Sequence, residues 1–387
     1  MKQFCALLSF SFSILVLNAQ SLEHLKFGTD STFEVATWNI ERFPKNGETT
    51  LVFVKDVIEA MQIDLLAIQE VSDTAAFRRL EQNIKSYKGH FESAYFGGLA
   101  YLYDSREIEI NSIYEIFSTS QFWNAFPRSP MVMDLNFNNE RIIVINNHFK
   151  CCGDGTLDIE DEGDEETRRL FAMNYLKEYV DANFANEKVI ILGDLNDELT
   201  DVNEHNVFKK ILGDSLNYSF ADFDISNGSS SDWSFPSWPS DLDHIIISNE
   251  LFSDFERNGS AVKTILVDEN LNGWQHYDQH ISDHRPVAIK LAFDNTNNIR
   301  AKTRKNETVE LYPNPNLGYF NISYSKKLKS GVLSIYNLQG AMLVSLPIQN
   351  DKNEKLKVSI NLANGIYLAQ IKDGDVVIGT TKLVISR

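Results

Sequence analysis

The feature that most constrains the fold of this chain is a series of short apolar runs that alternate with helix-like stretches. Ile142 to Ile145 and Val189 to Leu192 contain no polar residue, which predicts strands buried on both faces. Residues 51–61 instead repeat their apolar side chains at helical spacing. Strands interleaved with helices predict an α/β layered domain. The other segments of the series are Phe33 to Trp38, Leu65 to Ile68, Asp243 to Ser248 and Pro286 to Leu291, with a helix over about Glu165 to Asn183.

Charge divides the chain into two parts. A length of 387 residues is about right for two domains, and the net charge of −18 is shared unevenly between them. Residues 31–293 carry 21 basic and 45 acidic side chains, whereas residues 294–387 carry 13 basic and 7 acidic ones. The polar run at 294–308 cannot bury apolar area and is predicted to be a linker. Short alternating runs between Gly, Asn and Asp predict a small all-β sandwich over 309–387.

The first residues have the pattern of an export signal. Lys2 gives a positive start, Phe4 to Leu17 form an apolar run too short to span a bilayer, and Leu17-Asn18-Ala19 resembles a cleavage site. We expect residues 1–19 to be a signal peptide; the alternative is a buried N-terminal strand or helix. Cleavage would remove Cys5 and leave Cys151 and Cys152 in the mature chain. No later stretch predicts a transmembrane segment, and a monomer is expected.

Polar side chains follow the apolar runs at six places. Each alone is more typical of a turn, a solvated side chain or a hydrogen-bonded core histidine than of a catalyst. Together, they combine hard oxygen ligands with two histidines and so favour metal-assisted attack of water on a phosphodiester. The six segments are Thr37 to Glu41, Gln69-Glu70, Asn146 to Lys150, Gly193 to Asp197, Leu242 to His244, and Ser282 to Pro286.

The residue types suggest how the chemistry is divided. Oxygen ligands for Mg²⁺, Mn²⁺ or Ca²⁺ are available at four positions, and two histidines can donate to a phosphate or move protons near neutral pH. Asp194 and Asn196 are two residues apart, so on an extended segment they would face the same way. Asp243 could hold the far nitrogen of a histidine. The four candidate ligands are Asn39, Glu41, Glu70 and Asp283, and the histidines are His148 and His284.

The order of these segments resembles the endonuclease/exonuclease/phosphatase superfamily, whose fold is a four-layer α/β sandwich. The resemblance covers roughly Thr32 to Phe293 and is most similar to bacterial extracellular nucleases and pancreatic-type deoxyribonucleases. It implies that Asn39 and Glu70 bind a divalent metal, Mg²⁺ or Mn²⁺, with Glu41 a further ligand and Asp283 metal-linked or supporting the site. It also implies catalytic roles for His148, Asp194, Asn196, Asp243 and His284, and a phosphate contact for Arg128.

The substrate is open at this point. A secreted nuclease acting on extracellular DNA or RNA is our leading hypothesis, and a phospholipid or sphingomyelin phosphodiesterase, a phosphatase and an inactive surface binding protein are the alternatives. The acidity of the domain weakens the nucleic-acid hypothesis, because duplex binding normally draws on clustered basic residues. The side chains that would have to gather near the cleft are Arg42, Arg128, Lys150, Arg168 and Arg169.

Three further features each have more than one interpretation. Adjacent Cys151 and Cys152 could close a vicinal disulfide in an oxidising compartment or remain free thiols. Eight carboxylates in 154–166 could form a structural Ca²⁺ site or a solvated acidic loop. Trp233, Phe235 and Trp238 could form a base-stacking edge, a membrane-touching edge or a local packing cluster.

The tail carries a second resemblance. Leu311 to Pro315, Ser334 to Gly340, Leu362 to Tyr367 and Lys382 to Ile385 resemble the C-terminal sorting domain of the type IX secretion system. This implies an interaction with that machinery, passage across the outer membrane, and a secreted or surface-attached protein. An accessory module that binds carbohydrate is the alternative.

Overall fold

The computed structural model describes residues 22–91, 97–293, 309–324, 328, 330–337, 340–348, 356–374 and 376–386. The chain divides into two compact units, Met1–Asp294 and Asn295–Arg387. The predicted signal peptide (1–19) and linker (294–308) lie outside the described residues. Within the described part, no helix is long and apolar enough to cross a membrane.

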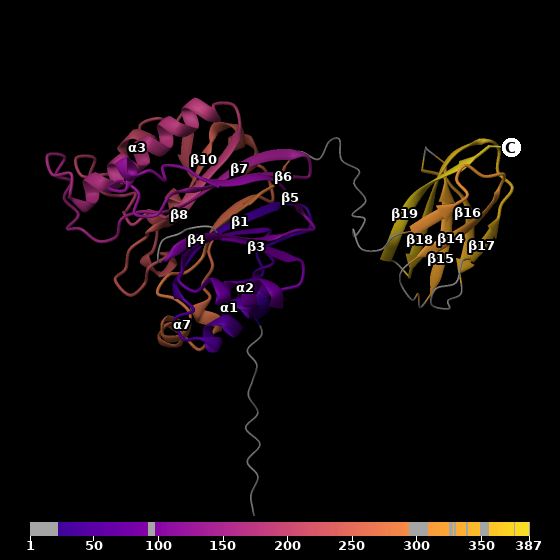
Figure 1. The fold of residues 1–387 in the computed structure, drawn as a ribbon, viewed down its shortest axis with the longest axis horizontal. Coiled ribbons are helices and arrows are strands. Elements are labelled where there is room, and N and C mark those ends of the chain that lie inside the picture. The colour runs from indigo at the N-terminus through magenta and orange to yellow at the C-terminus, as the bar shows by residue number, and fades with distance from the viewer. Residues whose placement is uncertain are drawn as a thin grey trace, which may run out of the picture. The chain divides into compact units, whose positions relative to one another are not determined.

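The first unit contains two six-stranded mixed sheets (Figure 1). One has the order β11-β12-β1-β2-β4-β3 and the other β5-β6-β7-β8-β10-β9. The β1–β2 and β7–β8 pairs are parallel, and the other pairs are antiparallel. The first sheet comprises β1 (Phe33–Phe43), β2 (Leu65–Val71), β3 (Tyr87–Phe91), β4 (Gly98–Asp104), β11 (Ala261–Thr264) and β12 (Val287–Leu291). The second comprises β5 (Ile108–Glu115), β6 (Met131–Phe137), β7 (Glu140–His148), β8 (Lys188–Asp194), β9 (Tyr218–Phe220) and β10 (Asp243–Ser248).

Helices cover the outer face of each sheet. Buried residues of α1 (Glu48–Met61), α2 (Thr74–Asn83) and α7 (Trp274–His280) form one core with β1 and β2. Buried residues of α3 (Glu165–Asn183) and α4 (Lys209–Leu212) form another with β7, β8 and β10. The short helices α5 (Phe223–Ser226) and α6 (Phe252–Phe255) lie beside β10 in the sequence.

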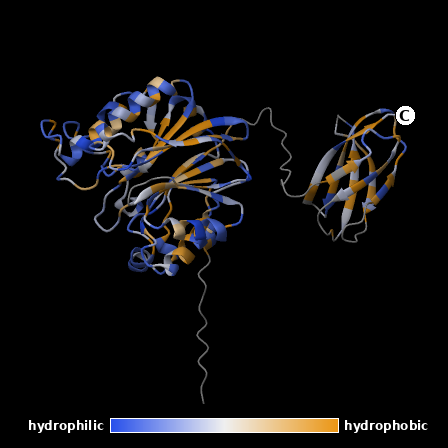
Figure 2. Ribbon diagram, in the orientation of Figure 1, coloured by the Kyte–Doolittle hydropathy of each residue, from blue (hydrophilic) through white to orange (hydrophobic). Residues whose placement is uncertain are grey.

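A third core fills the space between the two sheets, and it explains the near-continuous apolar runs. In β1, Phe33 and Val35 face the other sheet, whereas Ala36 and Trp38 face the helices. Side chains alternate along a strand, so a strand covered on both sides needs apolar residues in both phases. Figure 2 shows the resulting apolar strands beneath more polar helices. The layers are thus helix, sheet, sheet and helix, which confirms the predicted four-layer α/β sandwich.

The second unit is all β. One sheet has the order β13-β14-β17 and the other β16-β15-β18-β19, and their apolar residues form one core. This agrees with the predicted small β-sandwich. Its strands are β13 (Val309–Tyr312), β14 (Tyr319–Tyr324), β15 (Gly331–Tyr336), β16 (Met342–Ile348), β17 (Leu356–Ser359), β18 (Gly365–Asp373) and β19 (Val376–Ile385).

Candidate active site

Strand alternation explains how the candidate site is assembled. In β8, Ile190 and Leu192 pack between the sheets, and Asp194 is the next residue in the same phase. Antiparallel β10 begins at Asp243, which pairs with Asp194 in the register. Parallel β7 ends at His148, which also pairs with Asp194. Three adjacent strands of one sheet therefore place polar side chains at the same end of the inter-sheet core.

The other sheet contributes Asn39 from β1. Its amide Nδ2 donates to Asp194 Oδ2 at 2.9 Å and lies 3.3 Å from Glu70 Oε1. Asn39 is buried, and its backbone carbonyl accepts a hydrogen bond of 2.6 Å from Ser282 Oγ. A single amide thus links carboxylates that belong to two different sheets.

Glu70 reaches the site because the β1–β2 pairing is irregular. The register runs from Asn39 opposite Gln69 directly to Phe43 opposite Val71. Glu70 has a φ of +63°, a conformation that non-glycine residues adopt at functional sites more than elsewhere. Strict alternation would place Gln69 on the inter-sheet side, and the bulge brings Glu70 to Asn39 as well.

Glu41 lies on the other side of this irregularity. It has a φ of +30°, and its backbone N–H donates to Asn39 Oδ1 at 3.0 Å. Its carboxylate pairs with Lys45, which also contacts Asp278 at 3.1 Å. Glu41 is therefore adjacent to the site, but its charge is partly neutralised by Lys45.

His284 forms the strongest charge pair of the site. Its Nδ1 lies 2.6 Å from Asp243 Oδ2, and its Nε2 lies 3.8 Å from Asp194 Oδ2. Burial opposes protonation, but the carboxylates of Asp243 and Asp194 outweigh it and raise the pKa of His284 to about 10. The backbone N–H of His284 donates to Ser282 Oγ, and Phe235 packs on its ring at 4.9 Å. His284 is consequently held in place as an imidazolium.

His148 has the opposite protonation. Its Nε2 lies 3.4 Å from Asp194 Oδ2, and its buried Nδ1 has no hydrogen-bond partner. Burial, the charge of Arg128 and that of His284 lower the pKa of His148 well below its usual value. Burial raises the pKa of Asp194 to about 7, against the opposing effect of His284. A carboxyl that titrates near neutrality thus lies between a neutral and a charged imidazole.

Asn196 is near Asp194, but the two residues are not on an extended segment as we had expected. The segment is not extended: Asn196 has a φ of +56°, and its backbone N–H donates to Asp194 Oδ1 at 3.2 Å. This local hydrogen bond turns the chain directly after β8, as aspartate commonly does. Asn196 Nδ2 contacts the backbone oxygen of Phe149 at 3.4 Å.

Asp283 lies at the rim of the site. Its Oδ1 is 4.0 Å from His284 Nε2, and its side chain is partly exposed. Burial raises the pKa of Asp283 to about 6, although the charge of His284 opposes this.

The basic residues do not all gather at the cleft. Arg169 is 2% exposed, and it pairs with Glu166 at 3.1 Å and with Asp197 at 2.8 Å, so it braces loops rather than facing solvent. Arg168 donates to the backbone oxygen of Asn124. Nucleic-acid binding would require these arginines near the cleft, and buried, paired Arg169 does not meet that requirement.

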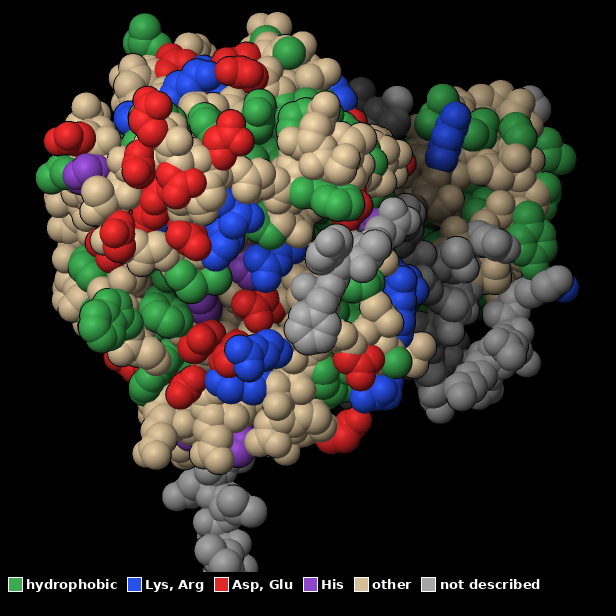
Figure 3. Space-filling model, turned by 60° about the vertical axis from the view of Figure 1, so that its left-hand side comes forward, with side chains coloured by type: hydrophobic (Ala, Val, Ile, Leu, Met, Phe, Trp, Pro, Cys, Tyr) green, Lys and Arg blue, Asp and Glu red, His purple; other side chains and the backbone are tan. Residues whose placement is uncertain are grey.

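Figure 3 shows a face of the molecule on which histidine, basic and acidic side chains gather around a hollow. Arg128 is half-buried and near enough to affect the titration of His148. Lys150 follows β7 directly, and its Nζ contacts the backbone oxygen of Cys151 at 2.8 Å and Glu165 at 3.4 Å. Two cations thus accompany the carboxylates, although the domain as a whole is acidic.

A buried polar bridge lies behind the site, and it joins Gln69 and Asn146, which belong to the six predicted segments but were given no role of their own. Gln69 Nε2 donates to Asn146 Oδ1 at 2.7 Å, and Asn146 Nδ2 donates to backbone oxygens of the other sheet at Ile68 and Ala100. Tyr101 OH donates to the second sheet and accepts from Asn146 N at 2.9 Å. The signal in the sequence is a polar residue inside an apolar strand, which needs a buried partner.

A second buried cluster lies on the helix side of β10. His244 Nδ1 is 2.6 Å from Asp222 Oδ2, and its Nε2 is 2.9 Å from the backbone oxygen of Asp197. Asp222 raises the pKa of His244 to about 9, although burial opposes this. Both ring nitrogens are engaged, so this cluster stabilises the loops around β10 and leaves no nitrogen for a ligand.

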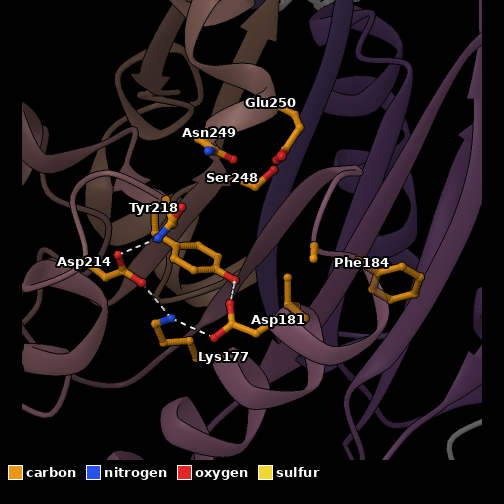
Figure 4. Close-up of a pocket in the computed structure, with 11 residues that line it drawn as sticks. Lys177, Asp181, Phe184, Asp214, Tyr218, Ser248, Asn249 and Glu250 are labelled. Atoms are coloured by element: carbon orange, nitrogen blue, oxygen red, sulfur yellow. Dashed lines mark hydrogen bonds and ion pairs between the residues drawn. The ribbon is translucent and has the colours of Figure 1, made fainter.

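The pocket beside the end of α3 is also unsuited to a phosphate (Figure 4). Lys177 contacts Asp181 at 2.8 Å and Asp214 at 2.7 Å, and Tyr218 donates to Asp181. The ammonium group of Lys177 is thus paired with two carboxylates and is not available to bind a phosphate. The pocket also contains Ser248, the last residue of β10, whereas Asp243 at the other end of that strand belongs to the candidate site.

The donor set of the candidate site fits a divalent metal of the Mg²⁺ type. Asp194, Asp243 and His284 bring side-chain atoms within 4.8 Å of one another, and the two carboxylates are the candidate ligands because protonated His284 cannot bind a cation. Asp243 Oδ1 is also buried without a hydrogen-bond partner. Glu70 adds a carboxylate next to Asn39. In the described residues, no such group of three occurs in the acidic loop 154–166, where carboxylates such as Asp161 accept backbone N–H groups.

Solved structures of other proteins resemble this chain. The solved structure of D. rerio TDP2 complexed with a single-strand DNA product has a TM-score of 0.51 and 12% identity, and covers 68% of this chain and 100% of that one. The human Nocturnin catalytic domain with bound sulfate has a TM-score of 0.49 and 17% identity, over 68% and 95% of the chains. At 12% identity the likeness to TDP2 concerns the fold alone.

One curated relative matches in sequence. A funoran endo-beta-hydrolase of Wenyingzhuangia aestuarii is 34% identical over 112 residues, or 27% of this chain and 15% of that protein. The chain therefore spans only a small part of that relative's length.

Two family models match the chain. The model described as secretion system C-terminal sorting domain matches residues 310–386, which supports export by type IX secretion to the surface or the medium. The model described as endonuclease/exonuclease/phosphatase family matches residues 36–284, from within β1 to His284. This chain belongs to the endonuclease/exonuclease/phosphatase family, whose members hydrolyse phosphodiesters or phosphate esters.

Proposed function

We propose that this chain is a secreted, divalent-metal-dependent phosphodiesterase that acts as a nuclease on extracellular DNA or RNA. One observation carries the proposal. Two histidines of opposite protonation flank Asp194, which also contacts Asn39 beside Glu70. Such a site combines cation ligands, a proton acceptor and a fixed positive charge, which hydrolysis of a phosphodiester requires.

The metal ligands in this proposal are Asn39 and Glu70, supported by Glu41 and Asp283. Mg²⁺ or Mn²⁺ bound there would neutralise charge on a phosphate and polarise its oxygen. The side-chain contact between Asn39 Nδ2 and Glu70 Oε1 supports this division. Glu41 pairs with Lys45 and Asp283 is at the rim, which fits supporting roles better than primary ones.

The protein side chains handle the proton and the developing charge. Asp194, with its pKa near neutrality, accepts the proton of the attacking water, and Asn196 helps to position that water. His284 remains protonated because Asp243 faces its Nδ1, and its Nε2–H donates to the phosphate oxygen on which charge develops. His148 donates a hydrogen bond to a second phosphate oxygen, and Arg128 and Lys150 contact flanking phosphates.

One observation favours a second candidate substrate. Trp238 is 79% exposed on the loop that carries Phe235, whose ring packs on His284. An exposed indole next to the site could stack on a base or enter a lipid interface. Phospholipid phosphodiesterase activity is therefore our alternative on the same catalytic residues.

The test uses the mature full chain with supercoiled plasmid, Mg²⁺ and Ca²⁺, with and without a chelator. We expect nicking that the chelator stops and that His284→Ala abolishes. His24→Ala, at an exposed histidine of the N-terminal turn, is the matched control and should keep full activity. Folded protein that hydrolyses phosphatidylcholine or sphingomyelin vesicles but nicks no plasmid in any metal would refute the nuclease proposal.

A further inference from the structure

Two adjacent thiols lie at the edge of the candidate site. Cys151 and Cys152 are both exposed, and their sulfurs are 2.9 Å apart, which is closer than two unbonded sulfurs normally pack. Cys152 has a φ of +73°, a conformation that a non-glycine residue adopts only when its surroundings enforce it. The turn therefore already brings the two sulfurs together.

Arg169 holds the backbone on both sides of Cys151. Its Nη1 donates to the backbone oxygen of Lys150 at 2.9 Å and to that of Cys152 at 2.7 Å. The same guanidinium pairs with Glu166 and Asp197, and it is buried. The turn is thus fixed to the loop after β8, three residues from Asp194, rather than free to open.

The thiols also adjoin Lys150, which we propose as a phosphate contact. Lys150 Nζ donates to the backbone oxygen of Cys151 at 2.8 Å and lies 3.8 Å from Cys151 Sγ. A bond between the two sulfurs would close an eight-membered ring that contains the Cys151–Cys152 peptide. Closing that ring constrains the Cys151–Cys152 peptide and with it the Cys151 carbonyl, one of the two groups that Lys150 now contacts, the other being Glu165 at 3.4 Å.

We propose that Cys151 and Cys152 are a redox site that forms a vicinal disulfide after export, and that the disulfide frees Lys150 for substrate. Two S–H bonds break and one S–S bond forms. The two electrons and two protons pass to a disulfide oxidant of the thiol–disulfide oxidoreductase or oxidised-glutathione class, which becomes the dithiol or two thiols. An exposed bond in a small ring is readily reduced again, so the site is reversible.

The covalent change is tested by mass spectrometry on the mature full chain, after treatment with oxidised glutathione or with a phosphine reductant. Trypsin cleaves after Lys150 and Arg168, so one peptide, 151–168, contains both cysteines. We expect this peptide to be about 2 Da lighter after oxidation and to resist alkylation. Two alkylated cysteines after oxidation, or a disulfide-linked dimer, would overturn the proposal. This measurement does not depend on any activity.

The effect on Lys150 is tested by kinetics, and this second part rests on the proposed function. We expect oxidation to lower KM for an oligonucleotide by about threefold with kcat unchanged, as one exposed phosphate contact would. The double variant Cys151→Ser/Cys152→Ser is the control, because the mature chain has no other cysteine for a reductant to affect. The KM of this variant should equal that of the reduced wild type, both after oxidised glutathione and after the reductant. Equal KM in both states of the wild type would refute this part, whether or not the variant folds.

Discussion

Replacing Asp243 with asparagine tests the proposed charge pair directly. Asp243→Asn keeps the size of the side chain and removes one negative charge that lies 2.6 Å from His284 Nδ1. The pKa of His284 is about 10 against an ordinary value of 6.5, so its protonated form is favoured by roughly 5 kcal/mol in total. Asp243 precedes Asp194 among the carboxylates responsible, so we assign it about half of that effect.

The sign of the change follows from this assignment. Losing Asp243 lowers the pKa of His284, so the imidazolium needed for phosphate binding is lost at a lower pH. We expect the alkaline limb of kcat/KM to move down from about pH 10 by roughly two pH units, with the acidic limb less affected. At pH 9 the rate should therefore fall roughly tenfold, whereas at pH 7 His284 stays mostly protonated and the rate should change much less.

The assay is kcat/KM for a chromogenic phosphodiester from pH 5 to pH 10.5, with circular dichroism at each pH to confirm that the variant is folded. The control is Asp278→Asn, which removes a partly exposed carboxylate near Lys45 and should leave the alkaline limb in place. An unchanged alkaline limb in folded Asp243→Asn protein would refute the role of the His284–Asp243 pair.

Three further predictions follow from the same structure. Glu70→Gln should raise the metal concentration needed for half-maximal activity at least tenfold, measured by Mg²⁺ titration, because it removes a carboxylate ligand. Trp238→Ala should raise KM for single-stranded DNA by about 5- to 100-fold, measured against Trp123→Ala, if the indole stacks on a base. His244 has a folded pKa of about 9, so its stabilisation is complete below pH 6.5 and is lost as pH rises through 9. His284 loses stabilisation over the same alkaline range, so urea unfolding from pH 6.5 to above pH 9 should show a stability loss that is roughly 3 kcal/mol smaller in His244→Gln than in the wild type.

The central strands and the site motifs were predictable from the sequence because strands covered on both faces require apolar residues, and the polar residues after them are easily recognised. β7 and β8 are covered on both faces, so their sequences are apolar throughout, and the polar residues that follow them stand out. The edge strand β5 was not identified: much of it is exposed and its pairing shifts register near Ile110, so no clean alternation remains.

Local backbone geometry was the other feature that could not be predicted from the sequence. The turn at Asn196 and the reoriented Glu70 depend on positive φ values that a carboxylate or amide adopts only in context. Arg169 could not be distinguished from an exposed arginine in the sequence, whereas in the structure it is buried and paired with Glu166 and Asp197. Sequence patterns place a residue on an element, and they do not reveal which partner it will find.

The division of the site between two sheets has a consequence for mutations far from it. Asn39 and Glu70 belong to one sheet, whereas Asp194 and Asp243 belong to the other, so their separation depends on how the sheets pack. Trimming a core residue such as Ile190 would leave a cavity between the sheets, and we expect partial relaxation around it to shift their relative positions. The turnover rate therefore depends on how the two sheets are aligned. Mild core substitutions should lower the turnover rate even where they barely lower the melting temperature.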